Sequence, residues 1–188
     1  GHIDGVPVAE LRSEMANLLA PVEGDVVVGV PESGGFYASL LAARSGLPYL
    51  PAFVQTLRGR SALLDDMGLR LSLIQLKANP IEALVKGKRV FLVDDSLITG
   101  LTLKAISQVL RHKAGVKEVR VGVVMPPLRS ECPYGAKTPP AGVMAANKLD
   151  ADELRLALEV DELKWPPLEK IRSVLEARGL TPCVACLL

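Results

Sequence analysis

The segment of residues 89–102 most constrains what this chain of 188 residues can fold into. Its first part, Val90-Phe91-Leu92-Val93, is a continuous apolar run, which is typical of a strand buried on both faces of a parallel sheet. Two adjacent carboxylates, Asp94 and Asp95, follow at once. Open α/β sheets bind ligands at this end of their strands. The segment therefore predicts an α/β domain with a polar site where this strand ends.

The acidic pair and the residues after it form a pattern that favours anion binding. Adjacent carboxylates repel each other, so the pair needs a metal, hydroxyl donors or solvent beside it. The next stretch, Ser96 to Thr102, is rich in hydroxyl groups and runs into a predicted helix, whose N-terminal N–H groups attract anions. Gly100 lets the chain approach an anion closely, and Thr99 can add a hydrogen bond. Simple helix capping needs one aspartate and no apolar strand before it, so we favour the binding loop.

Strands and helices alternate along the chain. The predicted strands are residues 25–31, 51–54, 89–93 and 119–124, and the predicted helices are residues 4–20, 37–44, 101–112, 150–158 and 166–178. Between residues 55 and 75 the sequence indicates a long loop. Alternating strands and helices require right-handed crossovers, which predicts a mainly parallel central sheet with helices on both faces.

Length and composition fit a single domain over residues 1–188, of which 49% are hydrophobic. We expect a core of about residues 21–126 and a small cap formed by the N-terminal helix, residues 1–20, and the C-terminal third, residues 127–188. The 22 basic and 21 acidic residues nearly cancel, which argues against nucleic acid as the main partner. No apolar run approaches the roughly 20 residues of a membrane span, and no signal peptide opens the chain. We expect a cytoplasmic protein.

The acidic pair and its loop resemble the signature of type I phosphoribosyltransferases, which is a hydrophobic strand, two acidic residues and a loop ending in Thr-Gly-x-Thr. The resemblance implies the fold of that family and a site for phosphoribosyl pyrophosphate (PRPP). It implies that Asp94 and Asp95 bind the ribose hydroxyls. The residues implied to hold the 5-phosphate are Ser96, Thr99, Gly100 and Thr102.

Other motifs, in order along nearly the whole chain, are similar to the phosphoribosyltransferase half of the glutamine PRPP amidotransferase family. The similar segments are Ile3-Asp4-Gly5-Val6-Pro7-Val8, Val30-Pro31-Glu32-Ser33-Gly34, Gly59-Arg60-Ser61, Leu76-Lys77-Ala78-Asn79-Pro80, Gly87-Lys88-Arg89-Val90, Pro126-Pro127, Cys132-Pro133-Tyr134-Gly135 and Cys183-Val184-Ala185-Cys186. The resemblance implies that the turn Glu32-Ser33-Gly34 binds pyrophosphate. It also implies Mg²⁺ held by the serine of that turn with Asp94 and Asp95, and two catalytic cations, Lys77 and Arg60, at the departing pyrophosphate.

The resemblance implies a reaction in which ammonia displaces pyrophosphate from C1 of PRPP, giving phosphoribosylamine for purine synthesis. Such a reaction depends on positioning and charge neutralisation, with Mg²⁺ contributing. It needs no protein nucleophile, and the sequence shows no Ser-His or Cys-His arrangement. The family's glutaminase domain has no counterpart in these 188 residues. Either the chain is an excised domain, or its nitrogen source is free ammonia or a separate glutaminase chain, or its role has changed; we also expect a homo-oligomer.

Several positions depart from the family pattern. Leu101 removes a hydroxyl from the phosphate loop, and Gln75 stands where the family has arginine. In the loop expected to close over substrate, Leu57 and Ala62 replace a tyrosine and a phenylalanine. Two alternatives therefore stay open: a non-catalytic PRPP-binding or regulatory module, and a phosphoribosyltransferase that salvages a purine or pyrimidine base.

The three cysteines, Cys132, Cys183 and Cys186, do not suggest a disulfide framework, because their number is odd and the chain is expected in the cytosol. A Cys-x-x-Cys pair with a third cysteine in a proline-flanked loop suggests a shared metal site. The resemblance places all three on ligand positions of a [4Fe-4S] cluster whose fourth ligand lies upstream of the matched region. Free buried thiols or a disulfide within the Cys-x-x-Cys pair are the alternatives.

Overall fold

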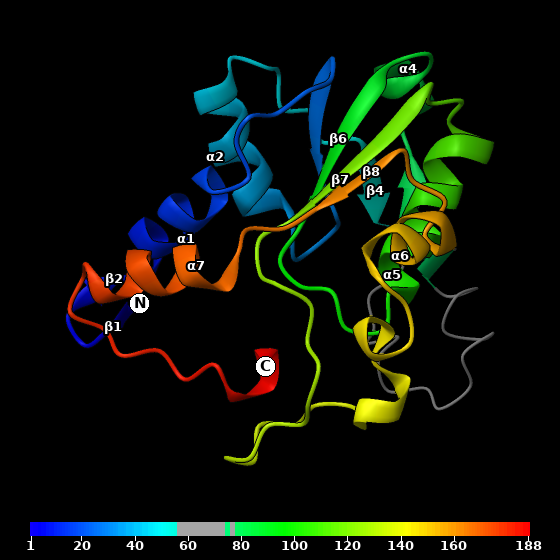
Figure 1. The fold of residues 1–188 in the computed structure, drawn as a ribbon. Helices are drawn as coiled ribbons and strands as arrows, with labels where there is room; N and C mark the ends of the chain where they lie inside the picture. Colours follow the sequence, from blue (N-terminus) through cyan, green and yellow to red (C-terminus); the bar gives the residue numbers. More distant parts are fainter. Residues whose placement is uncertain (56–73, 76–77) are drawn as a thin grey trace.

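The central element of the fold is a parallel four-stranded sheet in the order β3-β6-β7-β8 (Figure 1). The computed structural model of this chain describes residues 1–55, 74–75 and 78–188. The strands of the sheet are β3 (Val26–Gly29), β6 (Arg89–Asp94), β7 (Glu118–Val123) and β8 (Glu162–Lys164). All three pairs of neighbouring strands are parallel, which confirms the predicted parallel sheet.

Helices and two small antiparallel sheets surround this centre. The helices are α1 (Val8–Asn17), α2 (Gly35–Ser45), α4 (Glu82–Val85), α5 (Leu101–Gln108), the π-helix η2 (Val109–Lys113), the 3₁₀ turns η3 (Ala141–Val143) and η4 (Ala145–Asn147), α6 (Ala151–Ala157), α7 (Leu168–Glu176) and the 3₁₀ turn η5 (Ala185–Leu187). The small sheets pair β1 (His2–Ile3) with β2 (Val6–Pro7) and β4 (Phe53–Gln55) with β5 (Ala78–Pro80). None of the helices in the described ranges is long and apolar enough to cross a membrane.

Successive side chains of β6 enter two separate hydrophobic layers. Val90 and Leu92 pack in the layer that contains the buried residues of α5 and α6, whereas Phe91 and Val93 pack with those of α1 and α2. All four side chains are completely buried. Helices therefore cover both faces of the sheet, as predicted, and this explains why β6 is a continuous apolar run rather than an alternating one.

The N-terminal helix is shorter than the sequence pattern predicts. Residues 4–20 are expected to be helical, but α1 begins at Val8. Asp4 and Gly5 have φ angles of 48° and 80°, so they form a tight turn between β1 and β2 instead of a first helical turn. The predicted helix over residues 101–112 is also divided, because α5 ends at Gln108 and the chain continues as the π-helix η2.

The C-terminal third contributes both to the cap and to the sheet. Helix α7 lies beside α1, and Arg178 bridges them through an ion pair with Glu10 at 3.1 Å. Helix α6 begins with a capping box: Asp150 accepts a hydrogen bond from the backbone N–H of Glu153, whose side chain accepts one from the backbone N–H of Asp150. Strand β8 lies beyond residue 126 but pairs with β7 at the edge of the sheet. Its three residues carry no apolar run, so the sequence does not predict it.

Candidate active site

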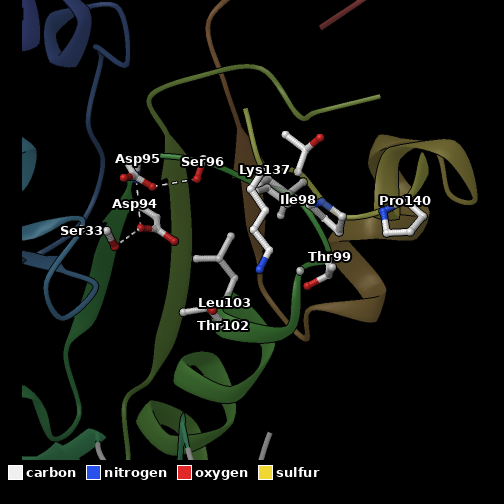
Figure 2. A pocket seen from close by; sticks show the side chains of 14 residues that line it. Ser33, Asp94, Asp95, Ser96, Ile98, Thr99, Thr102, Leu103, Lys137 and Pro140 are labelled. Atoms are coloured by element: carbon white, nitrogen blue, oxygen red, sulfur yellow. Dashed lines mark hydrogen bonds between the residues drawn. The ribbon is translucent and has the colours of Figure 1, made fainter. Parts of the chain in front are cut away.

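The acidic pair lies where β6 ends, beside the turn that follows β3 (Figure 2). Ser33 Oγ donates a hydrogen bond to Asp94 Oδ1 at 2.5 Å, and the backbone N–H of Asp95 donates to the same oxygen at 2.9 Å. Ser96 Oγ donates to Asp95 Oδ1 at 2.8 Å. The structure thus brings together residues 61 positions apart in the chain, the serine of the turn and the first aspartate of the pair.

Asp94 is held in an environment that disfavours its charge. The residue is only 4% exposed, and burial raises the pKa of its carboxyl to about 7. The hydrogen bond from Ser33 opposes this rise in pKa, while the negative charge of Asp95 adds to it. Within the described ranges no basic side chain forms an ion pair with either carboxylate. A buried acid that titrates near neutrality without a cation is typical of a functional site.

The pair opens into a cavity of about 610 Å³ between the ends of the strands and the C-terminal third of the chain. Seven of the predicted site residues line it: Ser33, Asp94, Asp95, Ser96, Thr99, Gly100 and Thr102. The other lining residues are Leu97, Ile98, Leu103, Lys137, Thr138, Pro139 and Pro140. The cavity therefore combines carboxylates with a wall of hydroxyl groups.

The hydroxyl wall is the loop that leads into α5. Gly100 has a φ of 76°, which side-chain-bearing residues rarely adopt, and an added Cβ would lie 3.0 Å from Cδ2 of Leu158. Helix α5 begins at the next residue, Leu101, whose N–H donates to Thr99 Oγ1 at 3.5 Å. Because the first N–H groups of a helix have no partner within it, the loop presents hydroxyls and a positive helix end to the cavity.

The three predicted residues of the turn after β3, Glu32-Ser33-Gly34, have different surroundings. Ser33 reaches the main cavity, whereas Glu32, with a φ of 71°, lines a neighbouring pocket of about 370 Å³. A Cβ on Gly34 would lie 1.9 Å from the carbonyl oxygen of Val93 and 2.6 Å from the nitrogen of Val30. Glycine is required here because the turn packs directly on the backbone of β6.

Comparison with known proteins identifies the family. Residues 8–143 match the model of the phosphoribosyl transferase domain. The chain belongs to the phosphoribosyltransferase family. Members of this family are glycosyltransferase-type enzymes that take PRPP as substrate and generally use Mg²⁺.

Named relatives of this phosphoribosyltransferase chain are amidophosphoribosyltransferases. The chloroplastic protein of Glycine max is 35% identical over 186 residues, covering 97% of this chain and 32% of the relative. The protein of Archaeoglobus fulgidus is 35% identical over 191 residues, covering 98% and 42%. The solved glutamine PRPP amidotransferase of B. subtilis, complexed with ADP and GMP, has a TM-score of 0.81 at 29% identity, covering 99% of this chain and 42% of that one. This confirms the type I fold, and the chain spans well under half the length of these relatives.

Two predicted catalytic cations, Arg60 and Lys77, lie outside the described residues, as do Leu57 and Ala62. Gln75, which stands where the family has arginine, is described. Its Nε2 donates a hydrogen bond to Oε1 of Gln108 in α5 at 2.9 Å.

The three cysteines of this phosphoribosyltransferase chain are free thiols. Cys183 is exposed, and Cys132 and Cys186 are partly buried. The carbonyl of Cys186 accepts a hydrogen bond from the N–H of Arg129 at 2.9 Å, so the C-terminal turn lies beside the proline-flanked segment. Across the described ranges, however, no group of three or more His, Cys, Asp or Glu side chains is arranged to hold a metal. A [4Fe-4S] cluster takes four thiolates, so the three cysteines of this chain do not by themselves complete the predicted cluster site.

Among the lining residues that sequence reasoning misses, four are consecutive: Lys137, Thr138, Pro139 and Pro140. They end the irregular segment that runs from Pro126-Pro127 to Pro139-Pro140, in which the sequence pattern indicates a cysteine ligand, Cys132, but no residue of a PRPP site. Only the fold brings this segment over the acidic pair, so no signal in the linear sequence assigns it to the site.

Proposed function

We propose that this chain transfers a 5-phosphoribosyl group from PRPP to ammonia, producing phosphoribosylamine and pyrophosphate. One observation carries the proposal: Asp94 and Asp95 share a single cavity with Ser33 and with the hydroxyl loop that leads into α5. The names of the relatives support the acceptor, since those proteins are amidophosphoribosyltransferases.

Each part of the cavity has a role in this reaction. The carboxylates of Asp94 and Asp95 accept hydrogen bonds from the ribose hydroxyls, and the loop from Ser96 to Thr102 holds the 5-phosphate. The turn containing Ser33 faces the pyrophosphate. Ammonia forms the new bond at C1 with its lone pair, pyrophosphate leaves with the electrons of the C1–O bond, and a proton passes from nitrogen to solvent. The protein contributes positioning and charge stabilisation and forms no covalent bond.

Mg²⁺ fits the donor set of this cavity. The ion is commonly held by one or two carboxylates, with substrate phosphates and water completing its ligands. Asp94 and Asp95, with the hydroxyl of Ser33, would hold it. When bound, Mg²⁺ neutralises charge on the leaving pyrophosphate. The raised pKa of Asp94 means that a cation at this position would displace a proton from the carboxyl near neutral pH.

Further parts of the proposal rest on the resemblance and on the names of the relatives. Arg60 and Lys77 would stabilise the departing pyrophosphate as cations. A separate glutaminase chain would supply ammonia in a homo-oligomeric cytoplasmic assembly. A cluster on the three cysteines remains a prediction from resemblance, and no step of the reaction passes through it. Iron content and visible absorption of anaerobically purified protein would test it.

The direct test is pyrophosphate release from PRPP and Mg²⁺ with and without ammonium. We expect release that depends on ammonium, and that falls strongly in the variant Asp94→Asn. The matched control is Asp152→Asn, because Asp152 is a highly exposed acid on α6, away from the cavity. Release that is equal in both variants and the parent chain would contradict the proposal.

A non-catalytic PRPP-binding module is the second candidate. Position 75, where the family pattern has arginine, holds a glutamine whose side chain is hydrogen-bonded to Gln108 in α5, so this position supplies no positive charge. Tight PRPP binding without any pyrophosphate release would favour this candidate, and release only with a purine or pyrimidine base would favour salvage.

A further inference from the structure

One basic side chain enters the cavity from a segment far from the loop in sequence. Lys137 is the single basic residue among the described residues that line it. Its side chain extends into the cavity between Asp94 and Thr99 in the view of Figure 2. The ammonium group therefore lies in the space that the proposed function assigns to PRPP.

The segment that carries this lysine forms backbone hydrogen bonds with the phosphate loop. The N–H of Leu128 donates to the carbonyl of Leu97 at 3.1 Å, and the N–H of Ala145 donates to that of Ile98 at 2.8 Å. These bonds fix the segment on both sides of Lys137 to two consecutive residues of the loop. The segment that carries the lysine is thus anchored to the loop at both of its ends.

Hydrogen bonds within the same segment also connect its two ends. Arg129 Nη1 donates to the carbonyl of Ala146 at 2.8 Å, and Asn147 Nδ2 donates to the carbonyls of Arg129 at 2.6 Å and Ala141 at 3.0 Å. Next to the lysine, Thr138 Oγ1 accepts a hydrogen bond from the N–H of Cys132 at 3.1 Å. The segment is therefore closed into a defined loop, and Lys137 is presented from a fixed backbone.

The charge of Lys137 is available to a ligand. Its ammonium forms no ion pair or hydrogen bond within the described part of the chain. Besides burial, the groups that set the pKa of Asp94 are Ser33 and Asp95, so the lysine does not serve as counter-ion to that carboxyl. The loop offers hydroxyls to a phosphate dianion, but its residues 96–102 include no basic side chain. A compact ammonium group suits phosphate as a point charge.

We propose that Lys137 binds the 5-phosphate of PRPP and supplies the charge that the hydroxyl loop lacks. The inference rests on the proposed function, because it takes the loop as the 5-phosphate site. It assigns the C-terminal cap a direct part in substrate binding, in addition to covering the sheet.

The test separates the two phosphate-bearing ends of PRPP by using ribose 5-phosphate and inorganic pyrophosphate as probes. Dissociation constants are measured by calorimetry at fixed Mg²⁺ for the parent chain and for Lys137→Met, which keeps the length of the side chain without its charge. We expect ribose 5-phosphate to bind about tenfold more weakly to this variant, the lower end for a hydrogen bond to a charged group, because Lys137 is solvent-exposed. Pyrophosphate should bind as before.

Two further variants complete the design. Lys137→Arg keeps the charge and should restore most of the affinity for ribose 5-phosphate. Lys148→Ala removes an exposed lysine of the same cap that lies off the cavity, and should change neither constant. Thermal unfolding of each variant checks that the fold is intact.

The outcomes distinguish this inference from the function on which it rests. Parent chain that binds PRPP, with ribose 5-phosphate affinity unchanged in Lys137→Met, would overturn the inference alone. A loss confined to pyrophosphate would also overturn it, because the lysine would then act at the leaving group. Parent chain that binds neither PRPP nor ribose 5-phosphate would overturn both.

Discussion

The two ends of the central sheet differ in whether their acidic side chains are paired with basic ones. At the amino end, Arg89 at the start of β6 contacts Asp25 through Nη2 and Oδ1 at 2.8 Å, and its backbone N–H donates to Oδ2. These bonds from Arg89 lower the pKa of Asp25 to about 2. At the carboxyl end of the same strand, Asp94 has no basic partner among the described residues, and burial raises its pKa to about 7.

The amino end holds a network of ion pairs at or near the surface. Arg120 of β7 contacts Glu23 at 2.7 Å, Glu162 of β8 at 3.2 Å and Glu118 at 3.3 Å. Such pairs contribute little each and are screened by salt, but they place each of these acids next to a basic side chain. At the carboxyl end, no described basic side chain pairs with the buried Asp94, and burial of an unpaired acid costs stability in the free protein. The difference indicates that one end serves the fold and the other is kept for a cationic or phosphate-bearing ligand.

The largest expected effect comes from the backbone on which the carboxyl end is built. We expect Gly34→Ala to lower the free energy of unfolding by about 3 kcal/mol or more, because its Cβ would overlap the carbonyl oxygen of Val93 at 1.9 Å. Urea denaturation measures the loss. Gly142→Ala is the control, since no atom lies within 4 Å of an added Cβ there. Equal stability of the two variants would show that the turn can move away from β6.

Removal of the buried charge should separate binding from stability. We expect Asp94→Asn to weaken Mg²⁺-dependent PRPP binding about 100-fold or more, because a ligand to the cation and to the ribose is lost. The same change should raise the free energy of unfolding at pH 8, since a neutral amide replaces a desolvated carboxylate. Calorimetry measures the dissociation constant of PRPP, and urea denaturation measures the free energy of unfolding. A variant that is both weaker in binding and less stable would break the contrast between the ends.

The sequence predicts those parts of the molecule whose structure depends on interactions between residues close together in the chain. The apolar run of β6 and the carboxylates behind it place the acidic pair, because a strand buried on both faces must end where such a run ends. The predicted helix over residues 150–158 is confirmed as α6, which begins with a local capping box of Asp150 and Glu153. The sequence pattern predicts Gly100 as a point of close approach to an anion, whereas the structure requires glycine there for its left-handed backbone and for the proximity of Leu158.

The parts that escape prediction depend on contacts between distant segments. Strand β8 is three residues long and exists because β7 offers an edge to pair with. Lys137 reaches the cavity only because Leu97 and Ile98 bind the segment that carries it. The order of the three cysteines matches a family pattern, but order along the chain does not fix whether thiols meet in space.

Stability of the free protein should depend on pH through Asp94. Its pKa is raised from 3.8 to about 7, so the folded state holds a proton that the unfolded state releases, and stability falls as pH rises from about 4 through 7. Between pH 6 and pH 8 we expect a loss on the order of 1 kcal/mol in the free energy of unfolding. Asp94→Asn should lack this part of the pH dependence. Parallel pH profiles for the two proteins would show that Asp94 is already ionised when buried.

The smallest effect is expected at the amino end. Because the pKa of Asp25 is lowered in the folded state, its pair with Arg89 stabilises the protein above about pH 4, and this contribution is lost as the pH falls toward 2. We expect Asp25→Asn to lower the urea midpoint slightly at pH 7 in low salt, and less in 1 M salt, because the pair is exposed. PRPP affinity should stay the same. A loss of PRPP affinity comparable to that of Asp94→Asn would mean that charge at the amino end of β6 influences the ligand site at its carboxyl end. The two ends would then not have separate roles in stability and binding.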